Sequence, residues 1–278
     1  MDTCRRPVCR ALRLSVPQCV LPHHYGEVLF ATGDWARAEE ELQAAIRLSE
    51  NSLPAVQAKA LASLAELRLS QGRVEEAGRL LAGFEAHDAS APVCIRIYLL
   101  QDKFALAAAT AQRWLEVIGE ARLQCTPLLE LLGEAEIGQA QIEAATGRGR
   151  ALAETGSTLD CQVMLARGER LQGRALAAAS DSSAMQHLDT ALRSFVRLEM
   201  QYEAARTRQL IARALRRLDP EVAEAEARAA LAVFENLGAV LDAESTSTLL
   251  REIEIKTSKR TGKAPHPAGL TPREVEVL

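Results

Sequence analysis

The sequence predicts an all-α protein, a solenoid of about six antiparallel helix pairs. The composition is typical of helices, because alanine and leucine are abundant, 4% of the 278 residues are aromatic, and runs of β-branched residues are almost absent. A hydrophobic pattern with helical spacing also returns about every 39 residues, which indicates stacked helix pairs. With 48% hydrophobic residues, the chain has enough apolar side chains for a sizeable core.

The N-terminal residues 1–22 lack this regularity and contain three prolines, so we expect an irregular segment there. A helical face begins at Tyr25, and Gly33 with Asp34 predicts a tight turn. The helix after the turn has an apolar face made of Trp35, Ala38, Leu42, Ala45 and Ile46. Together these two segments predict a helical hairpin.

The same pattern returns 39 residues later, where Gly72, Val74, Ala77 and Leu81 occupy the positions that correspond to Gly33, Trp35, Ala38 and Leu42. Weaker copies are centred on Phe104 and Ala107, on Ile142 and Ala145, and on a polar turn at Ser180. The clearest repeat lies between residues 191 and 250: Ala191, Leu192, Phe195 and Leu198 recur as Ala230, Leu231, Phe234 and Leu237, again at a spacing of 39. This periodicity predicts a helical repeat domain over residues 23–254.

Within each pair, a small residue is expected where the two helices cross, and a bulky residue is expected to fill the groove between neighbouring pairs. The expected crossing residues are Ala38, Ala77, Ala107 and Ala145, and the expected bulky buried residues are Trp35, Leu42, Leu81, Phe195 and Phe234. Over residues 25–254 this arrangement resembles the tetratricopeptide repeat. The period is nearer 39 than 34 residues and the closing proline is mostly absent, so the resemblance is to a tetratricopeptide-like repeat, as in the helical region of MalT-like LuxR-type regulators.

Residues 255–269 change in character, with four lysine or arginine residues among Thr, Ser, Gly and Pro, and they predict a basic flexible linker. Residues 270–278 then open a new helix, with Thr271 as N-cap, Pro272 at the first helical position, and Arg273 and Glu274 in the first turn. The run from Gly269 to Leu278 resembles the opening of the LuxR-type helix-turn-helix DNA-binding domain. The resemblance implies that this chain holds only the start of that domain, and that DNA would be bound through the part that is cut off.

The overall charge does not favour nucleic acid, since the formal net charge is −4. The six cysteines are scattered along a long helical chain, and we expect them to be reduced thiols. Cys4, Cys9, Cys19, His23 and His24 raise the alternative of a zinc site, but their spacing departs from that of paired zinc ligands. We therefore expect no metal and no cofactor, and the lack of a long apolar run predicts a cytoplasmic protein that does not cross a membrane.

Catalytic signatures are missing from the sequence: it contains no nucleophile elbow, zinc-binding helix, dinucleotide fingerprint or kinase motif. The five histidines give little sign of a base held by a carboxylate, and His187 and Asp189 lie on different faces of a helix. An enzyme is therefore not expected.

Two stripes of arginine form the candidate effector groove: Arg167, Arg170 and Arg174 on one helix, and Arg206 and Arg213 on a helix of the next repeat. They would suit an acidic peptide or effector, and the alternative is that they are solvated and paired with Glu169 and Glu203. Two functions remain open. The first is the sensor and protein-interaction region of a LuxR-type transcriptional regulator, for which a homodimer is a further expectation. The second is a free-standing scaffold that binds peptides or partner proteins.

Overall fold

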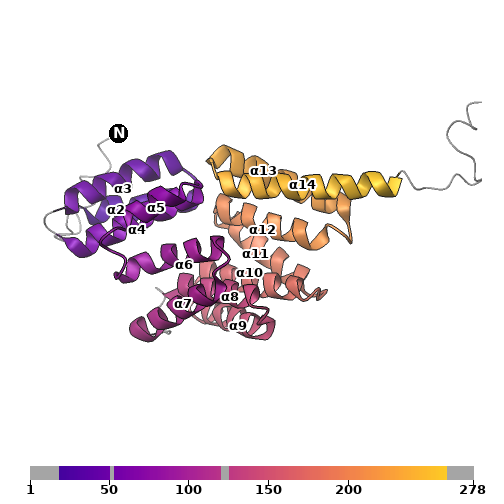
Figure 1. Ribbon diagram of the computed structural model, residues 1–278, viewed down its shortest axis with the longest axis horizontal. Helices are drawn as coiled ribbons and strands as arrows, with labels where there is room; N and C mark the ends of the chain where they lie inside the picture. Colours follow the sequence, from indigo (N-terminus) through magenta and orange to yellow (C-terminus); the bar gives the residue numbers. More distant parts are fainter. Residues whose placement is uncertain (1–18, 51–52, 120–124, 262–278) are drawn as a thin grey trace, which may run out of the picture.

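The computed structural model describes residues 19–50, 53–119 and 125–261, with side chains as far as residue 255. In this part of the chain every regular element is a helix, so the all-α prediction is confirmed (Figure 1). The helices in order are α2 (Val20–Thr32), α3 (Trp35–Ser49), α4 (Pro54–Ser70), α5 (Val74–Leu80), the short 3-10 helix η1 (Asp88–Ser90), α6 (Ala91–Leu100), α7 (Phe104–Ile118), α8 (Thr126–Gly138), α9 (Ile142–Thr158), α10 (Gln162–Ala178), α11 (Ala184–Arg197), α12 (Gln201–Leu215), α13 (Pro220–Leu237) and α14 (Val240–Thr261).

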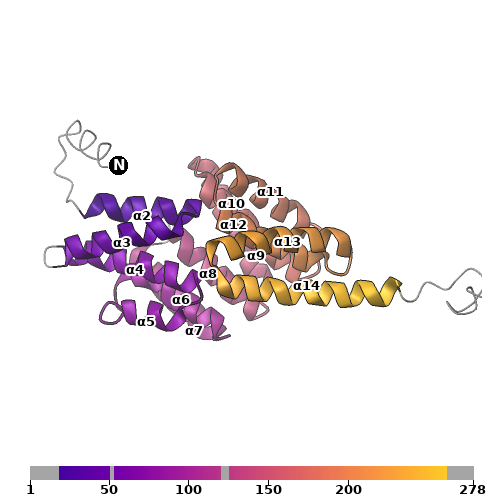
Figure 2. The same ribbon diagram turned by 90° about the horizontal axis from the view of Figure 1, so that it is seen from above.

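The helices form six consecutive pairs, from α2 with α3 to α12 with α13, and α14 packs against the last pair. Figures 1 and 2 show these pairs following one another around a curve, from α2 to α5 through α6 to α9 and on to α10 to α14. This is the predicted tetratricopeptide-like solenoid. None of the described helices combines the length and the apolar character needed to span a lipid bilayer.

The turns within the pairs follow the predicted chemistry where glycine is present. Gly33 ends α2 with φ of 95°, a left-handed conformation that glycine adopts without strain, and the Asp34 carboxylate accepts a hydrogen bond from the Arg37 backbone N–H at 3.3 Å. Other turns place a non-glycine residue in the same left-handed region: Asp102, Ala140, Asp160, Ser180 and Glu199 all have φ between 50° and 60°. At Asp102, Ala140 and Ser180, in the middle of the chain, the glycine signal of the repeat is therefore missing from the sequence.

The predicted core positions are confirmed. The crossing residues Ala38, Ala77, Ala107 and Ala145 are fully buried, and the bulky residues Trp35, Leu42, Leu81, Phe195 and Phe234 are each at most 4% exposed. Trp35 packs in one cluster with Leu64 and Leu67 of the neighbouring pair as predicted, but it also has a contact that the sequence did not predict. It also packs against Tyr202 of α12, in the sixth pair along the chain.

The solenoid closes on itself through one apolar cluster that joins its two ends. Leu29, Trp35 and Leu42 of the first pair share this cluster with Tyr202 of α12 and Phe234 of α13. Gly33 and Gly72 mark further contacts of the same kind, since a Cβ atom at either glycine would lie 3.2 Å from a leucine side chain of α13 or α14. The helix pairs therefore form a closed ring, and the inner surfaces of the pairs face a central space that is partly open to solvent.

The domain boundaries differ slightly from the predicted ones. Helix α2 begins at Val20, inside the segment 1–22 that was predicted to be irregular. Helix α14 continues to Thr261, so residues 255–261 are helical although they were assigned to the linker 255–269. The cause is that no glycine or proline interrupts the helical sequence before Gly262. Residues 262–278, with the predicted helix start at Thr271, Pro272, Arg273 and Glu274, lie outside the described residues.

Close contact between α9 and α10 generates a stability prediction. A Cβ atom added at Gly156 would lie 2.4 Å from the Leu165 backbone nitrogen, whereas one added at Gly147 of the same helix meets nothing within 4 Å. We expect Gly156→Ala to lower the free energy of unfolding by about 1 to 3 kcal/mol, because the two backbones must move apart. Gly147→Ala should raise it by about 0.5 to 1 kcal/mol through helix propensity. Denaturant melts measure both values, and equal effects of the two substitutions would contradict this packing.

Candidate functional site

The space inside the ring is a cavity with two adjoining compartments. The wide compartment has a volume of about 560 Å³ and a wall that comes chiefly from the first helix of each pair, α2, α4, α6, α8, α10 and α12. Its charged and polar lining residues are His23, His24, Glu27, Lys59, Ser63, Glu66, Asp88, Arg96, Glu130, Glu134, Arg167, Tyr202, Glu203 and Arg206. Apolar side chains such as Phe30, Val93, Leu128 and Met200 complete its wall.

The narrow compartment has a volume of about 280 Å³ and lies between α4, α6, α8, α10, α12 and α14. Its charged and polar lining residues are Arg96, Glu130, Glu134, Arg170, Arg174, Arg206, Gln209, Arg213, Asp242 and Ser245. Arg96, Glu130, Glu134 and Arg206 line both compartments, so these four side chains mark the boundary between them. The two compartments together form one elongated cavity.

A network of ion pairs crosses this boundary. Arg170 of α10 is 3% exposed, and its two terminal nitrogens lie 2.6 Å from a Glu130 oxygen of α8 and 2.5 Å from a Glu203 oxygen of α12. Arg167 lies one turn earlier on α10 and is within 3.7 Å of the same two glutamates. One arginine stripe on α10 therefore links three inner helices.

Glu134 forms the second centre of the network. Its carboxylate lies 2.8 Å from Arg174 of α10 and 3.4 Å from Arg206 of α12, and Arg206 also lies 3.5 Å from Glu203. The sequence produces this arrangement because Glu130 and Glu134 are four residues apart on α8 and therefore share one helical face. Arg96 of α6 pairs with Glu66 of α4 in the same way on the other side of the cavity.

The network keeps its glutamates ionised. Burial disfavours the charged form of Glu134, but the positive charges of Arg174 and Arg206 outweigh burial and lower its pKa from 4.5 to about 2. Burial also disfavours the charged form of Glu203, but the positive charges of Arg170 and Arg206 outweigh burial and hold the pKa of Glu203 well below its usual range. Glu134 and Glu203 are therefore ionised at neutral pH, and their negative charges are compensated by the neighbouring arginines.

Tyr202 connects the cavity to the closure of the ring. Its ring lies 5.2 Å from that of Trp35 and 6.0 Å from that of Phe234, both edge-on, and its hydroxyl donates a hydrogen bond of 2.8 Å to Asp242 of α14. Burial raises the pKa of Tyr202 to about 12, so the hydroxyl keeps its proton. The sequence analysis did not select Tyr202, because its partners lie far from it along the chain.

The structure brings the five arginines of the predicted groove into this one cavity. Arg167 lines the wide compartment, Arg206 lines both, and Arg170, Arg174 and Arg213 line the narrow one. The alternative of paired arginines is correct for Glu203, whereas Glu169 contacts His187 instead, at 2.7 Å. The partners missed from the sequence are Glu130, Glu134 and Glu66, and a search for acidic residues on the first helix of each pair would have found them.

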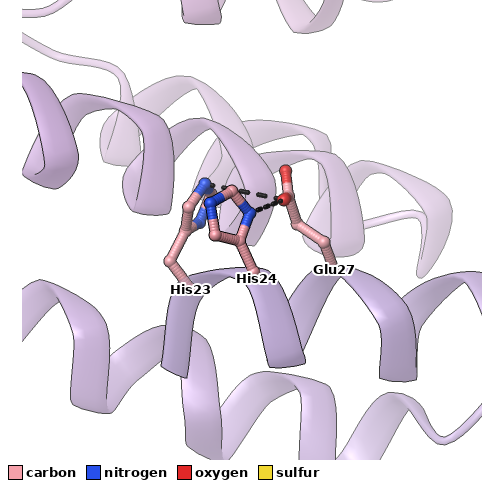
Figure 3. Close-up of side chains that lie close together, drawn as sticks. All are labelled: His23, His24 and Glu27. Atoms are coloured by element: carbon pink, nitrogen blue, oxygen red, sulfur yellow. Dashed lines mark hydrogen bonds and ion pairs between the residues drawn. The ribbon is translucent and has the colours of Figure 1, made fainter. Parts of the chain in front are cut away.

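A histidine cluster lies at the rim of the wide compartment, at the start of α2. His23 and His24 lie side by side and both face Glu27, whose Oε2 lies 3.6 Å from His23 Nε2 and 3.1 Å from His24 Nδ1 (Figure 3). In the described part of the chain, these three residues form the group whose ligand atoms lie close enough together to bind a metal ion. However, burial chiefly lowers the pKa of His23, and its Nδ1 has no hydrogen-bond partner in the described residues, whereas ligating histidines normally donate from the second nitrogen.

The earlier zinc hypothesis involved Cys4, Cys9 and Cys19 beside these histidines. Cys4 and Cys9 lie outside the described residues, and Cys19 is buried with a free thiol. The expectation that histidines lack carboxylate partners is wrong, since His24, His87 and His187 each contact a carboxylate within 3.1 Å. These contacts are local or between neighbouring helices, and among the described residues no nucleophilic side chain is hydrogen-bonded to these histidines.

Comparison with known proteins identifies the fold class. No family model matches the chain, and no curated protein matches it. The solved structure of a Rap protein complexed with the competence and sporulation factor has a similar fold: the TM-score is 0.67 at 16% identity, with 89% of this chain and 74% of that chain covered. BtubC (BKLC) from P. vanneervenii shares 16% identity over 86% of this chain and 94% of its own. The TM-score for this pair is 0.36, which is too low to indicate the same fold. The likeness to the Rap protein shows a tetratricopeptide-like helical repeat.

The charge network predicts a specific loss of stability in acid. Since the pKa of Glu134 is about 2 in the folded protein and 4.5 ordinarily, its ionised form stabilises the folded state above pH 4.5. This contribution, up to about 3 kcal/mol, should disappear as the pH falls from 4.5 towards 2. Glu134→Gln should therefore lower the unfolding free energy at neutral pH, and the difference from wild type should shrink in acid.

The exposed Glu143 provides the control for this experiment, because Glu143→Gln removes the same charge without entering the network. Urea melts across the pH range measure both variants. A difference between wild type and Glu134→Gln that does not change with pH would show that Glu134 is not held ionised by its arginines.

Proposed function

We propose that this protein is a binding module, not an enzyme, and that it binds a short extended peptide inside its helical ring. The observation that supports this proposal is the elongated cavity built from the inner helices of all six pairs. Its wall combines apolar side chains with fixed ionised groups, which suits a ligand that carries both apolar side chains and a polar backbone. The similar Rap structure is itself a complex with a bound factor.

The ion-pair network supports binding without large rearrangement. Arg170 connects α8, α10 and α12 before any ligand enters, so the wall of the cavity is already held in place. A preformed wall reduces the entropy lost on binding. Two wall atoms, Glu66 Oε2 and Arg167 Nε, also lack hydrogen-bond partners among the described residues, and they offer one acceptor and one donor to a peptide backbone after a small side-chain rotation.

The structure restricts which substitutions test this proposal. Charge reversal at Arg206 would place a third carboxylate beside Glu134 and Glu203, so the protein would lose stability whether or not it binds a peptide. Ser63 is a better position, because it lies on α4, lines the wide compartment and is partly exposed. Phenylalanine at this position would fill part of the cavity.

We expect Ser63→Phe to abolish or strongly weaken peptide binding, while Ser182→Phe, on the exposed turn before α11, leaves binding unchanged. The measurement is affinity selection from a synthetic mixture of short random-sequence peptides, read by mass spectrometry, with circular dichroism melts to confirm folding. Failure of the wild-type protein to enrich any peptide would contradict the proposed function. Equal enrichment by Ser63→Phe and wild type would place the peptide outside the cavity.

The second candidate function is the regulatory region of a LuxR-type transcription factor. It depends on Thr271, Pro272, Arg273 and Glu274, whose order resembles the opening of the LuxR-type helix-turn-helix domain. Cytoplasmic location, homodimer formation and DNA binding through a further domain remain predictions of that reading. A gel-shift titration of a fusion that supplies such a domain tests it, and the peptide-binding proposal does not depend on the result.

A further inference from the structure

Charge is distributed unevenly between the two compartments. Among the lining residues that belong to one compartment alone, carboxylates outnumber cations four to two in the wide compartment, and cations outnumber carboxylates three to one in the narrow compartment. The cations that line only the narrow compartment are Arg170, Arg174 and Arg213, and the carboxylate that lines only this compartment is Asp242. A ligand with separated charges would therefore be favoured in one orientation.

The three cations of the narrow compartment differ in how their charge is compensated. Arg170 is enclosed by two glutamates, and Arg174 has one, Glu134, at 2.8 Å. Arg213 donates a hydrogen bond of 2.6 Å to the Ser245 hydroxyl, and no ion pair in the described residues joins it to a carboxylate. Arg213 is thus an exposed cation that lines the cavity and has unused donors.

The surroundings of Arg213 add to its excess positive charge. Its pKa is lowered first by burial of the guanidinium and then by the positive charges of Arg174 and Arg216. Asp242 forms no ion pair with Arg213 in the described residues, and its carboxylate accepts a hydrogen bond from the Tyr202 hydroxyl. An anion placed between Arg174 and Arg213 would relieve the repulsion between these two cations.

We propose, building on the peptide-binding function above, that the narrow compartment binds the C-terminal α-carboxylate of the peptide between Arg174 and Arg213. The N-terminal part of the peptide then extends into the wide compartment, where carboxylates are in excess. A guanidinium presents N–H donors in a planar fork that matches the two oxygens of a carboxylate. Side-chain carboxylates share this chemistry, so the experiment must separate the two sources.

The apolar wall of the narrow compartment specifies the residue that carries this carboxylate. The lining leucines are Leu69, Leu99, Leu100, Leu171, Leu210 and Leu241. Leu69 and Leu171 are buried, but the other four leucines are half-buried or exposed and provide apolar surface in the compartment. Burial of an apolar side chain against them is favourable. The last residue of the peptide is therefore apolar, with its side chain among the leucines and its carboxylate on the arginines.

Two peptide mixtures of random sequence test the proposal, one with free C-terminal carboxylates and one with C-terminal amides. We expect the protein to enrich free acids that end in an apolar residue. For a selected peptide, the amide form should bind at least about tenfold more weakly by isothermal titration calorimetry, because the charged hydrogen bonds are lost. Arg213→Gln should weaken the free acid by a similar factor and leave the amide unaffected.

Arg217→Gln is the matched control, since Arg217 is an exposed cation next to α12 that does not line the cavity. Equal affinity of acid and amide, or an equal effect of Arg213→Gln and Arg217→Gln, would overturn the proposal. Retained binding of amides that end in Asp or Glu, with loss of neutral free acids, would also overturn it and assign the site to a side-chain carboxylate. If Ser63→Phe abolishes enrichment in any of these cases, the proposed peptide binding in the cavity still holds although the carboxylate site does not. The two proposals can therefore fail separately.

Discussion

The packing of Tyr202 between Trp35 and Phe234 determines the shape of the molecule. These three rings join the first helix pair to the sixth and bury apolar surface that a linear solenoid would leave at its ends. The Tyr202 hydroxyl also donates a hydrogen bond to Asp242, so α14 is fixed to the same junction. Because the ring is closed, the inner faces of the helices enclose a cavity where an open solenoid would present a broad concave surface.

Enclosure has an electrostatic consequence. Charged side chains on the inner helices lose contact with water, and ionised groups in such a place are tolerated when each is paired and hydrogen-bonded. Arg170 with Glu130 and Glu203 satisfies this condition, and so does Glu134 with Arg174 and Arg206, which form part of one continuous network. The paired arginines therefore support the wall, and the groups left for a ligand are the few cations and carboxylates towards the two ends of the cavity.

The sequence was sufficient to predict the fold class and the buried positions, because both depend on local periodicity. Phe195 and Phe234, spaced 39 residues apart, are both fully buried as expected. The closed ring was not predictable in the same way, since contacts between Trp35 and Tyr202 produce no local pattern. The arginine stripes were visible, but their main partners on α8, Glu130 and Glu134, could be identified only once three helices had been placed side by side.

A double-mutant cycle between Trp35 and Tyr202 tests the closed ring most directly. Unfolding free energies are measured for wild type, Trp35→Leu, Tyr202→Leu and the double variant, and the cycle isolates the interaction between the two side chains. Ring closure predicts a coupling energy of about 1 kcal/mol, typical of an edge-on aromatic pair. Strictly additive effects of the two substitutions would mean that the first and sixth helix pairs do not meet, and the enclosed cavity would then not exist in solution.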